Sequence, residues 1–241
     1  MTNDGAGLGI KVSPVELCAL FFLLLILNTS PQCQTVAPNP AAQAPLSQIV
    51  LLIDINADQD KVFALEKLLA QDMLCHLRRQ GFVFPVIAFG PHGSRVINSG
   101  TDPDETLAAI RNLSLEAGEE RSSAAPHLYQ ALQAATRNFN SDRKSKALLV
   151  ISGGREDMSY KEFKTIRSTL STNQIVCHVA IVSSHALYGT RAIQVRGFYL
   201  RNLAAKTHGK YVELGKREDQ VLAVVAKLTE RILLQSKQRS R

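Results

Sequence analysis

The sequence lacks the motifs on which most common enzyme mechanisms depend. It contains no Gly-x-Ser-x-Gly nucleophile elbow, no His-Glu-x-x-His zinc motif, no P-loop and no dinucleotide-binding fingerprint. The six histidines are scattered. His178 falls within an apolar strand pattern, which favours a hydrogen-bonded core residue over a catalyst. We therefore expect that the protein is not an enzyme.

Zinc-finger spacing and repeats that mix aromatic with basic residues are also missing, which argues against nucleic-acid binding. The net charge of +7 and the pI of about 9.4 are modest. Part of the positive charge is crowded at the C-terminus, in Lys227, Arg231, Lys237, Arg239 and Arg241. This distribution leaves room for a weak attraction to anionic surfaces.

No apolar run is long enough to cross a membrane as a helix. Leu17–Leu27 is apolar throughout, but about eleven residues is the length of a signal-peptide core, whereas a span needs roughly 20. Few positive charges precede this run, and no clean small-x-small cleavage site follows it. We expect export to the periplasm or the cell exterior, with cleavage between Ser30 and Ala37. An uncleaved membrane anchor is the alternative.

Composition divides the chain into four parts. Residues 1–33 form the signal peptide or anchor, residues 34–45 a linker rich in Pro and Ala, and residues 237–241 a basic tail. Residues 46–236 form the folded domain, since 45% hydrophobic and 20% charged residues are ordinary for a globular protein. Within the domain, Cys75 and Cys177 look like small buried hydrophobic residues. Their spacing neither requires nor excludes a disulfide between them.

Strand and helix patterns alternate along the domain. A hairpin is expected at 82–98 through Gly90–Gly93, with Pro85 placing its first strand towards an edge or beside a bulge. Capping signals at Asp102 and Ser159 begin two helices. The expected strands are 48–54, 82–89, 95–98, 146–152, 175–182 and 210–214, and the expected helices cover 62–77, 102–113, 127–139, 159–170, 199–207 and 221–232. This order predicts an α/β domain with a doubly wound, mostly parallel sheet, one antiparallel edge strand and helices on both faces.

The first strand of the domain ends in polar residues. After the apolar run from Ile49 to Ile53 come Asp54, Asn56 and Asp58 at alternate positions. Ligands of α/β sheets are met at the carboxyl ends of the strands, and three oxygen-bearing side chains there could bind a hard cation. In the alternative interpretation, Asp58 caps the next helix and Asp54 accepts backbone N–H bonds from the neighbouring loop.

The order of elements resembles a von Willebrand factor type A (vWA) domain, which has a Rossmann-like fold. The resemblance covers roughly residues 46–235 and rests on Ile49–Asp58, Ala125–Leu132, Ala147–Gly154 and Leu200–Tyr211. A single such domain behind an export segment and a Pro/Ala linker looks like the exported bacterial members.

The family's metal-ion-dependent adhesion site (MIDAS) uses an Asp-x-Ser-x-Ser turn, a threonine and a second aspartate around a divalent cation. Here Asp54 matches the first aspartate, whereas Asn56 and Asp58 stand at the two serines. Pro126 aligns with the threonine and Gly153 with the second aspartate. The resemblance thus implies a degenerate site. Mg²⁺ or another divalent cation would depend on Asp54, Asn56 and Asp58, helped by Ser122, Ser123 or Asp157.

These observations predict a non-catalytic module that binds a protein partner at the carboxyl-end loops without an obligatory metal cofactor. The candidate contact residues are Asn56, Asp58, Ser122, Ser123, Arg155 and Glu156. One alternative is a metal-dependent adhesion domain with a rearranged cation site at Asp54, Asn56 and Asp58. Another is a structural protein of the cell envelope, associated with the membrane through its N-terminal apolar segment.

Overall fold

Strand β1 (Ser47–Asp54) lies at the centre of a seven-stranded sheet. The computed structural model describes residues 47–56, 60–115, 127–182, 197–214 and 219–239, and residues 39–241 form a compact unit of their own. The strand order is β4-β3-β1-β5-β6-β7, with a short strand β2 also paired to β1. The other strands are β2 (Phe82–Val83), β3 (Val86–Gly90), β4 (Gly93–Asn98), β5 (Ser145–Ser152), β6 (Ile175–Val182) and β7 (Tyr211–Leu214).

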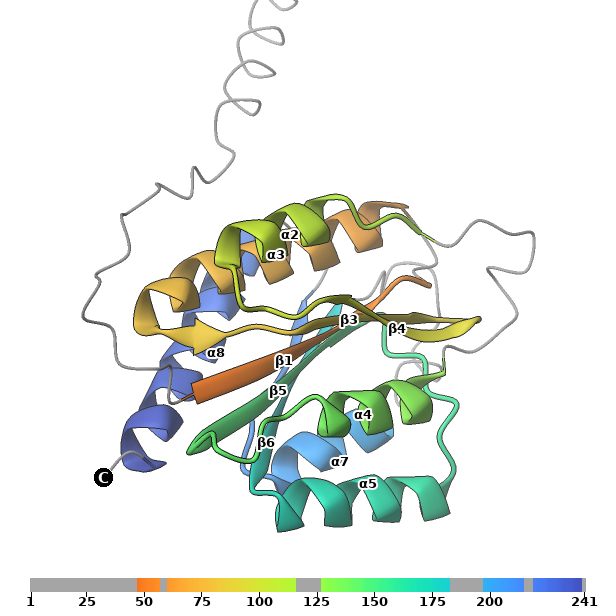
Figure 1. Cartoon of the computed structure of the whole chain (residues 1–241). Helices are drawn as coiled ribbons and strands as arrows, with labels where there is room; N and C mark the ends of the chain where they lie inside the picture. The colour runs from red at the N-terminus through yellow and green to blue at the C-terminus, as the bar shows by residue number, and fades with distance from the viewer. Residues whose placement is uncertain (1–46, 57–59, 116–126, 183–196, 215–218, 240–241) are drawn as a thin grey trace, which may run out of the picture. The chain divides into compact units, whose positions relative to one another are not determined.

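Every strand pair is parallel except β3 with β4, which forms the antiparallel hairpin expected around Gly90–Gly93. Helices α2 (Asp60–Leu77), α3 (Pro103–Arg111) and α8 (Asp219–Arg239) cover one face of the sheet. Helices α4 (Leu128–Arg137), α5 (Tyr160–Thr172) and α7 (Phe198–Lys206) cover the other (Figure 1). This arrangement confirms the predicted fold class.

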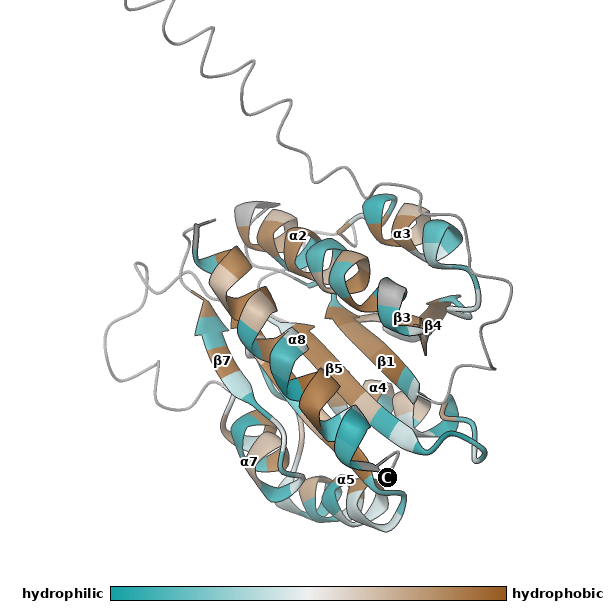
Figure 2. Ribbon diagram, turned by 90° about the vertical axis from the view of Figure 1, so that its left-hand side faces the viewer, coloured by the Kyte–Doolittle hydropathy of each residue, from teal (hydrophilic) through white to brown (hydrophobic). Residues whose placement is uncertain are grey.

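The central strands are apolar on both faces because both faces are covered by helices. All eight residues of β1 and all eight of β6 are buried, and Figure 2 shows β1 and β5 in the hydrophobic colour over most of their length. The predicted inward faces of α4 and α5 are confirmed. Their buried residues include Leu128, Leu132 and Ala135 on α4 and Phe163, Ile166 and Leu170 on α5.

Local signals in the sequence set several helix ends. The Asp102 carboxylate accepts hydrogen bonds from the backbone N–H of Asp104 (2.7 Å) and Glu105 (3.2 Å), which caps α3. Ser159 and Glu162 form the predicted capping box at the start of α5. After α2, a 3₁₀ turn at Arg78–Gln80 ends at Gly81, whose φ of 73° lies in the left-handed region.

Pro85 divides what the sequence predicted to be one strand at residues 82–89. Strand β2 stops at Val83 and β3 begins at Val86, and the Pro85 carbonyl between them accepts a hydrogen bond from the Leu51 N–H at 2.8 Å. The prediction of a single strand was wrong, because proline has no N–H with which to continue a ladder. Strand β3 lies next to the edge strand β4. A register shift at Val86–Ile87 confirms the predicted bulge.

His178 on β6 is fully buried and hydrogen-bonded, as the strand pattern predicted. Its Nδ1 accepts a hydrogen bond from the Lys210 N–H (3.2 Å), so the proton of the neutral ring is on Nε2, which donates to Gln235 Oε1 at 3.0 Å. Burial lowers the pKa of His178 to about 4. The imidazole therefore ties α8 and the start of β7 to the sheet as an uncharged group.

The two cysteines of the domain differ. Cys177 is buried and free, as expected for a small apolar core residue, and burial raises the pKa of its thiol to about 12. Cys75 is half-buried and disulfide-bonded, so the prediction that it is a buried apolar residue was wrong. The two thiols are not joined to each other.

Helix α8 continues through Arg239, so the first residues of the predicted basic tail are helical. Among the described residues, none of the helices combines the length and apolar character needed to cross a membrane. The predicted signal peptide or anchor and the Pro/Ala linker lie outside those residues.

Candidate functional site

The sheet changes its direction of winding between β1 and β5. From β1 the chain proceeds to β3 on one side, and β5, β6 and β7 are then added on the other side. The crevice at the carboxyl ends of two such strands is where open α/β sheets bind ligands. Asp54 is the last residue of β1 and Ser152 the last of β5, so both lie at this crevice.

A hydrogen bond joins the two strand ends. The Ser152 hydroxyl donates to Asp54 Oδ2 at 2.8 Å and accepts from the Gly154 N–H at 3.0 Å. The other carboxylate oxygen, Asp54 Oδ1, accepts from the Asn56 N–H at 2.9 Å. Asp54 is only 1% exposed, so the carboxylate faces the protein interior. The alternative in which Asp54 accepts backbone N–H bonds is confirmed.

Burial dominates the electrostatics of this carboxylate. Loss of hydration raises the pKa of Asp54 from its ordinary 3.8 to about 6, although hydrogen bonds from Asn56, Ser152 and Gly153 and the charge of Arg155 oppose the rise. Sequence reasoning missed Ser152 as a partner. Ser152 could have been found from its position, because it is the final residue of the strand that pairs in parallel with β1.

The two acids of the loop after β5 are engaged with helix starts. The Glu156 carboxylate accepts hydrogen bonds from the backbone N–H of Leu200 (2.7 Å) and Tyr199 (3.0 Å) at the start of α7. Asp157 accepts from the Leu128 N–H at 3.0 Å at the start of α4, and its second oxygen lies 3.7 Å from His127 Nδ1. Negative charge at a helix N-terminus is stabilising, so both acids hold neighbouring helices around the crevice.

Among the described residues, the counterparts of the family's cation ligands make other contacts or lack a side chain. Both oxygens of Asp54 already accept hydrogen bonds, Asp157 caps α4, and Gly153 has no side chain with which to replace the second aspartate. Among the described residues there is no group of three or more His, Cys, Asp or Glu side chains that could hold a metal ion. Asn56 is also buried (5% exposed). The predicted ligand and contact residues Asp58, Ser122 and Ser123 lie outside the described residues.

Aromatic side chains gather beside this site, at the starts of α5 and α7. We call Tyr160, Phe163, Tyr199 and Phe198 the aromatic rim. Its rings are adjacent in that order, with centroids 6.2, 5.2 and 5.4 Å apart. The two outer members are exposed, Tyr160 by 60% and Phe198 by 55%.

Basic groups lie over the aromatic rim. Lys164 Nζ is 4.5 Å from the centre of the Tyr160 ring, and Arg167 is 5.8 Å from that of Phe163. Sequence reasoning missed the aromatic rim because its members come from two helices that only the tertiary structure brings together. Of the predicted contacts, Arg155 and Glu156 lie in the loop that leads from the Asp54 crevice to this rim.

No protein-family model matches the sequence, and no curated protein matches it. Solved structures with the same fold do exist. The chain is similar to the conserved hypothetical protein BatB from Bacteroides thetaiotaomicron, with a TM-score of 0.60 at 15% identity over 77% of this chain and 98% of that one. A similar match is an aerotolerance-related membrane protein from Bacteroides fragilis, with a TM-score of 0.57 at 13% identity and the same coverage of both chains.

A third similar structure is the SpRpn10 VWA domain, with a TM-score of 0.55 at 11% identity over 75% of this chain and 93% of that one. These likenesses confirm the predicted fold, so the chain contains a vWA-like domain.

Proposed function

We propose that this chain is an exported, non-catalytic interaction module that binds a protein partner at the carboxyl-end rim without an obligatory metal. The observation that carries the proposal is the exposed aromatic rim beside a crevice bridged by the Asp54–Ser152 hydrogen bond. Exposed aromatic residues beside arginine are typical of the centres of protein interfaces. The vWA-like fold supports the same class of function, as a general property of such domains.

Within this proposal, the contact surface is Tyr160, Tyr199 and Phe198 of the aromatic rim together with Arg155, whereas the predicted contact Asn56 is buried and supports the surface from beneath. Glu156 contributes by holding α7, and with it Phe198 and Tyr199, in place through its hydrogen bonds to the α7 N-terminus. Asp54 contributes by fixing the turn that carries Asn56. Asp58, Ser122 and Ser123 remain predicted contacts on the same rim.

Export is supported by the N-terminal apolar run and by the disulfide at Cys75, because disulfides persist in oxidising compartments. The membrane protein among the similar structures fits an envelope location.

Panning a displayed library of random peptides against residues 39–241 tests the partner-binding surface. Peptides that bind should lose at least about tenfold in affinity when Tyr160→Ser and Phe198→Ser are combined, because truncation of aromatic anchors removes most of the binding energy. Leu222→Ser on α8 is the matched control, since Leu222 is 64% exposed but lies away from the rim. Peptides that bind the double variant as well as the native domain would refute the proposed surface.

The metal-dependent alternative is separated by thermal unfolding in chelator and then in Mg²⁺, Mn²⁺ and Ca²⁺. A cation that binds the folded domain must raise its midpoint by mass action, by about 2.7 kcal/mol of stability at a hundredfold excess over the dissociation constant. We expect no shift, and peptide binding that persists in chelator. A rise that disappears in Asp54→Ala would replace our proposal with the adhesion-site function.

A further inference from the structure

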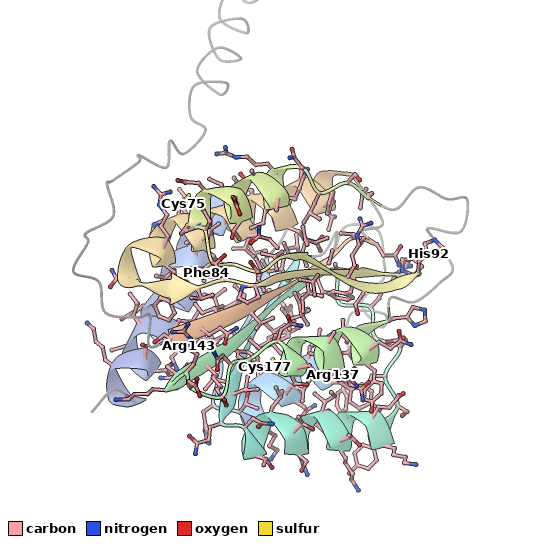
Figure 3. All side chains as sticks on the ribbon, viewed as in Figure 1. Cys75, Phe84, His92, Arg137, Arg143 and Cys177 are labelled. Carbon is pink, nitrogen blue, oxygen red and sulfur yellow. The ribbon has the colours of Figure 1, made fainter. Side chains whose placement is uncertain are left out.

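Basic side chains, most of them exposed and two half-buried, gather at the end of the sheet where β1 and β5 begin, opposite the crevice. Figure 3 shows Arg143 at this end and His92 at the other. The group comes from the α4–β5 connection, from the α7–β7 connection and from the last turns of α8. We call it the amino-end basic surface, and its members are Arg143, Lys144, Lys146, Lys206, Lys210, Arg231 and Lys237.

Hydrogen bonds place these three segments side by side. Lys146 lies on the first rungs of β5, opposite Gln48 of β1 and Ile175 of β6. The Lys210 N–H bonds to His178, whose other ring nitrogen bonds to Gln235 on α8. Arg231 bonds to the His208 carbonyl at 3.4 Å. Figure 2, which views the molecule from this end, shows hydrophilic colour near the C-terminal label.

Few acids balance this positive charge. Among the described residues of the same segments, the acidic members are Asp142 and Glu230. Asp104 at the start of α3 is already paired with Arg78 at 2.9 Å. In the described part of the chain, no salt bridge involves Lys144, Lys210 or Lys237. Their positive charges are therefore available to attract an anionic partner at this end of the domain.

The chain also enters the domain at this end. Ser47, the first residue of β1, shares a hydrogen bond of 2.8 Å with Ser236 on the last turns of α8. The apolar run Leu17–Leu27 and the Pro/Ala linker precede Ser47 in the sequence. The segment that contains the apolar run is thus joined to the domain at the amino-end basic surface.

We infer that the amino-end basic surface binds the anionic headgroups of a lipid membrane. Each Lys or Arg near an anionic lipid surface strengthens binding by about fivefold, so several together bind measurably even without the apolar run. The orientation follows from the fold: with this end on the membrane, the carboxyl-end rim points away from it. The attachment point of an apolar run on the same end favours lipid over nucleic acid as the anionic partner.

Vesicle co-sedimentation tests the inference on residues 39–241 carrying Cys75→Ser, which removes the thiol that forms a disulfide in the full chain. Vesicles of phosphatidylglycerol and phosphatidylcholine in equal parts are compared with pure phosphatidylcholine, each at low and high salt. We expect binding only to the mixed vesicles and weakening with salt. Neutralising Lys144, Lys210 and Lys237 together to Gln should reduce the affinity about a hundredfold, at fivefold per residue.

A matched control removes the same three charges elsewhere, through Arg95→Gln, Arg111→Gln and Lys161→Gln, and should bind within about threefold of the native domain. Thermal unfolding verifies that both triple variants are folded. Equal losses from the two triple variants would mean that net charge alone is sensed and would overturn the inference. So would equal binding to both kinds of vesicle, or tighter binding to a DNA duplex than to the mixed vesicles at the same salt.

Discussion

Asp54→Asn should remove the part of the pH dependence of folding stability that comes from ionisation of the buried Asp54 carboxylate. The side chain keeps its size, but it can no longer ionise. In the native protein, burial raises the pKa of Asp54 to about 6 from 3.8. Between these values the folded state keeps a proton that the unfolded state has released. Native stability therefore falls as the pH rises through this window and is level above it.

The magnitude follows from the size of the pKa difference. A difference of about 2 units, at 1.36 kcal/mol each, makes the buried carboxylate cost about 3 kcal/mol above pH 6. The free energy of unfolding of Asp54→Asn, relative to the native protein, should therefore rise by about 3 kcal/mol between pH 4 and pH 7. The absolute difference at any one pH also contains the rearranged hydrogen bond to Ser152, so the change with pH is the diagnostic quantity.

Urea denaturation followed by circular dichroism at intervals from pH 4 to pH 8 measures this difference. Asp142→Asn, which removes one exposed carboxylate, controls for the loss of a negative charge. If the difference for Asp54→Asn stays within about 0.5 kcal/mol across the window, then the carboxylate is hydrated or cation-bound and our account of its burial is refuted.

Four further substitutions, one of them a control, test the scaffold around the site. Glu156→Ala removes the acceptor for the α7 N-terminus and should lower the urea-derived stability by about 1–2 kcal/mol; unchanged stability would contradict the cap. Burial lowers the pKa of His178 to about 4, so native stability should rise with pH between about 4 and 6.5. His178→Leu should abolish this rise, and a pH profile that keeps it would contradict the assignment. Gly209→Ala places a Cβ 1.8 Å from the Cys177 carbonyl oxygen and should prevent stable folding, whereas Gly81→Ala, with no atom within 4 Å, should cost only about 1 kcal/mol by thermal unfolding. Equal midpoints for these two variants would refute the steric argument.

Patterns that depend on neighbouring residues were predictable from the sequence. Strand β6 was predicted at residues 175–182 and is observed there, because a strand buried on both faces is apolar without interruption. The Ser159–Glu162 capping box was equally predictable, since all of its hydrogen bonds lie within one helical turn.

Features that depend on distant segments were not predictable in the same way. Glu156 was predicted to contact a partner and Asp157 to help hold a cation, but they cap α7 and α4, whose starts reach this loop only in the folded chain. The Asp54–Ser152 bond joins residues 98 positions apart. The aromatic rim likewise requires α5 and α7 to be neighbours. Local sequence patterns identify candidate residues, but they do not identify the distant residues that those side chains contact in the folded domain.

The central place of β1 has a consequence for biosynthesis. Among the described strands β1 is made first, yet its parallel neighbour β5 follows it by about a hundred residues, as the separation of 98 positions between Asp54 and Ser152 shows. At ribosomal rates of about 5–20 residues per second, β1 waits about 5–20 s for that neighbour. During that time the apolar side chains of Ile49–Ile53, which are buried in the folded domain, are exposed on both faces of the strand and can aggregate. A nascent chain that is released before Ser145 should aggregate, so escape from the ribosome and completion of the sheet must be closely coupled.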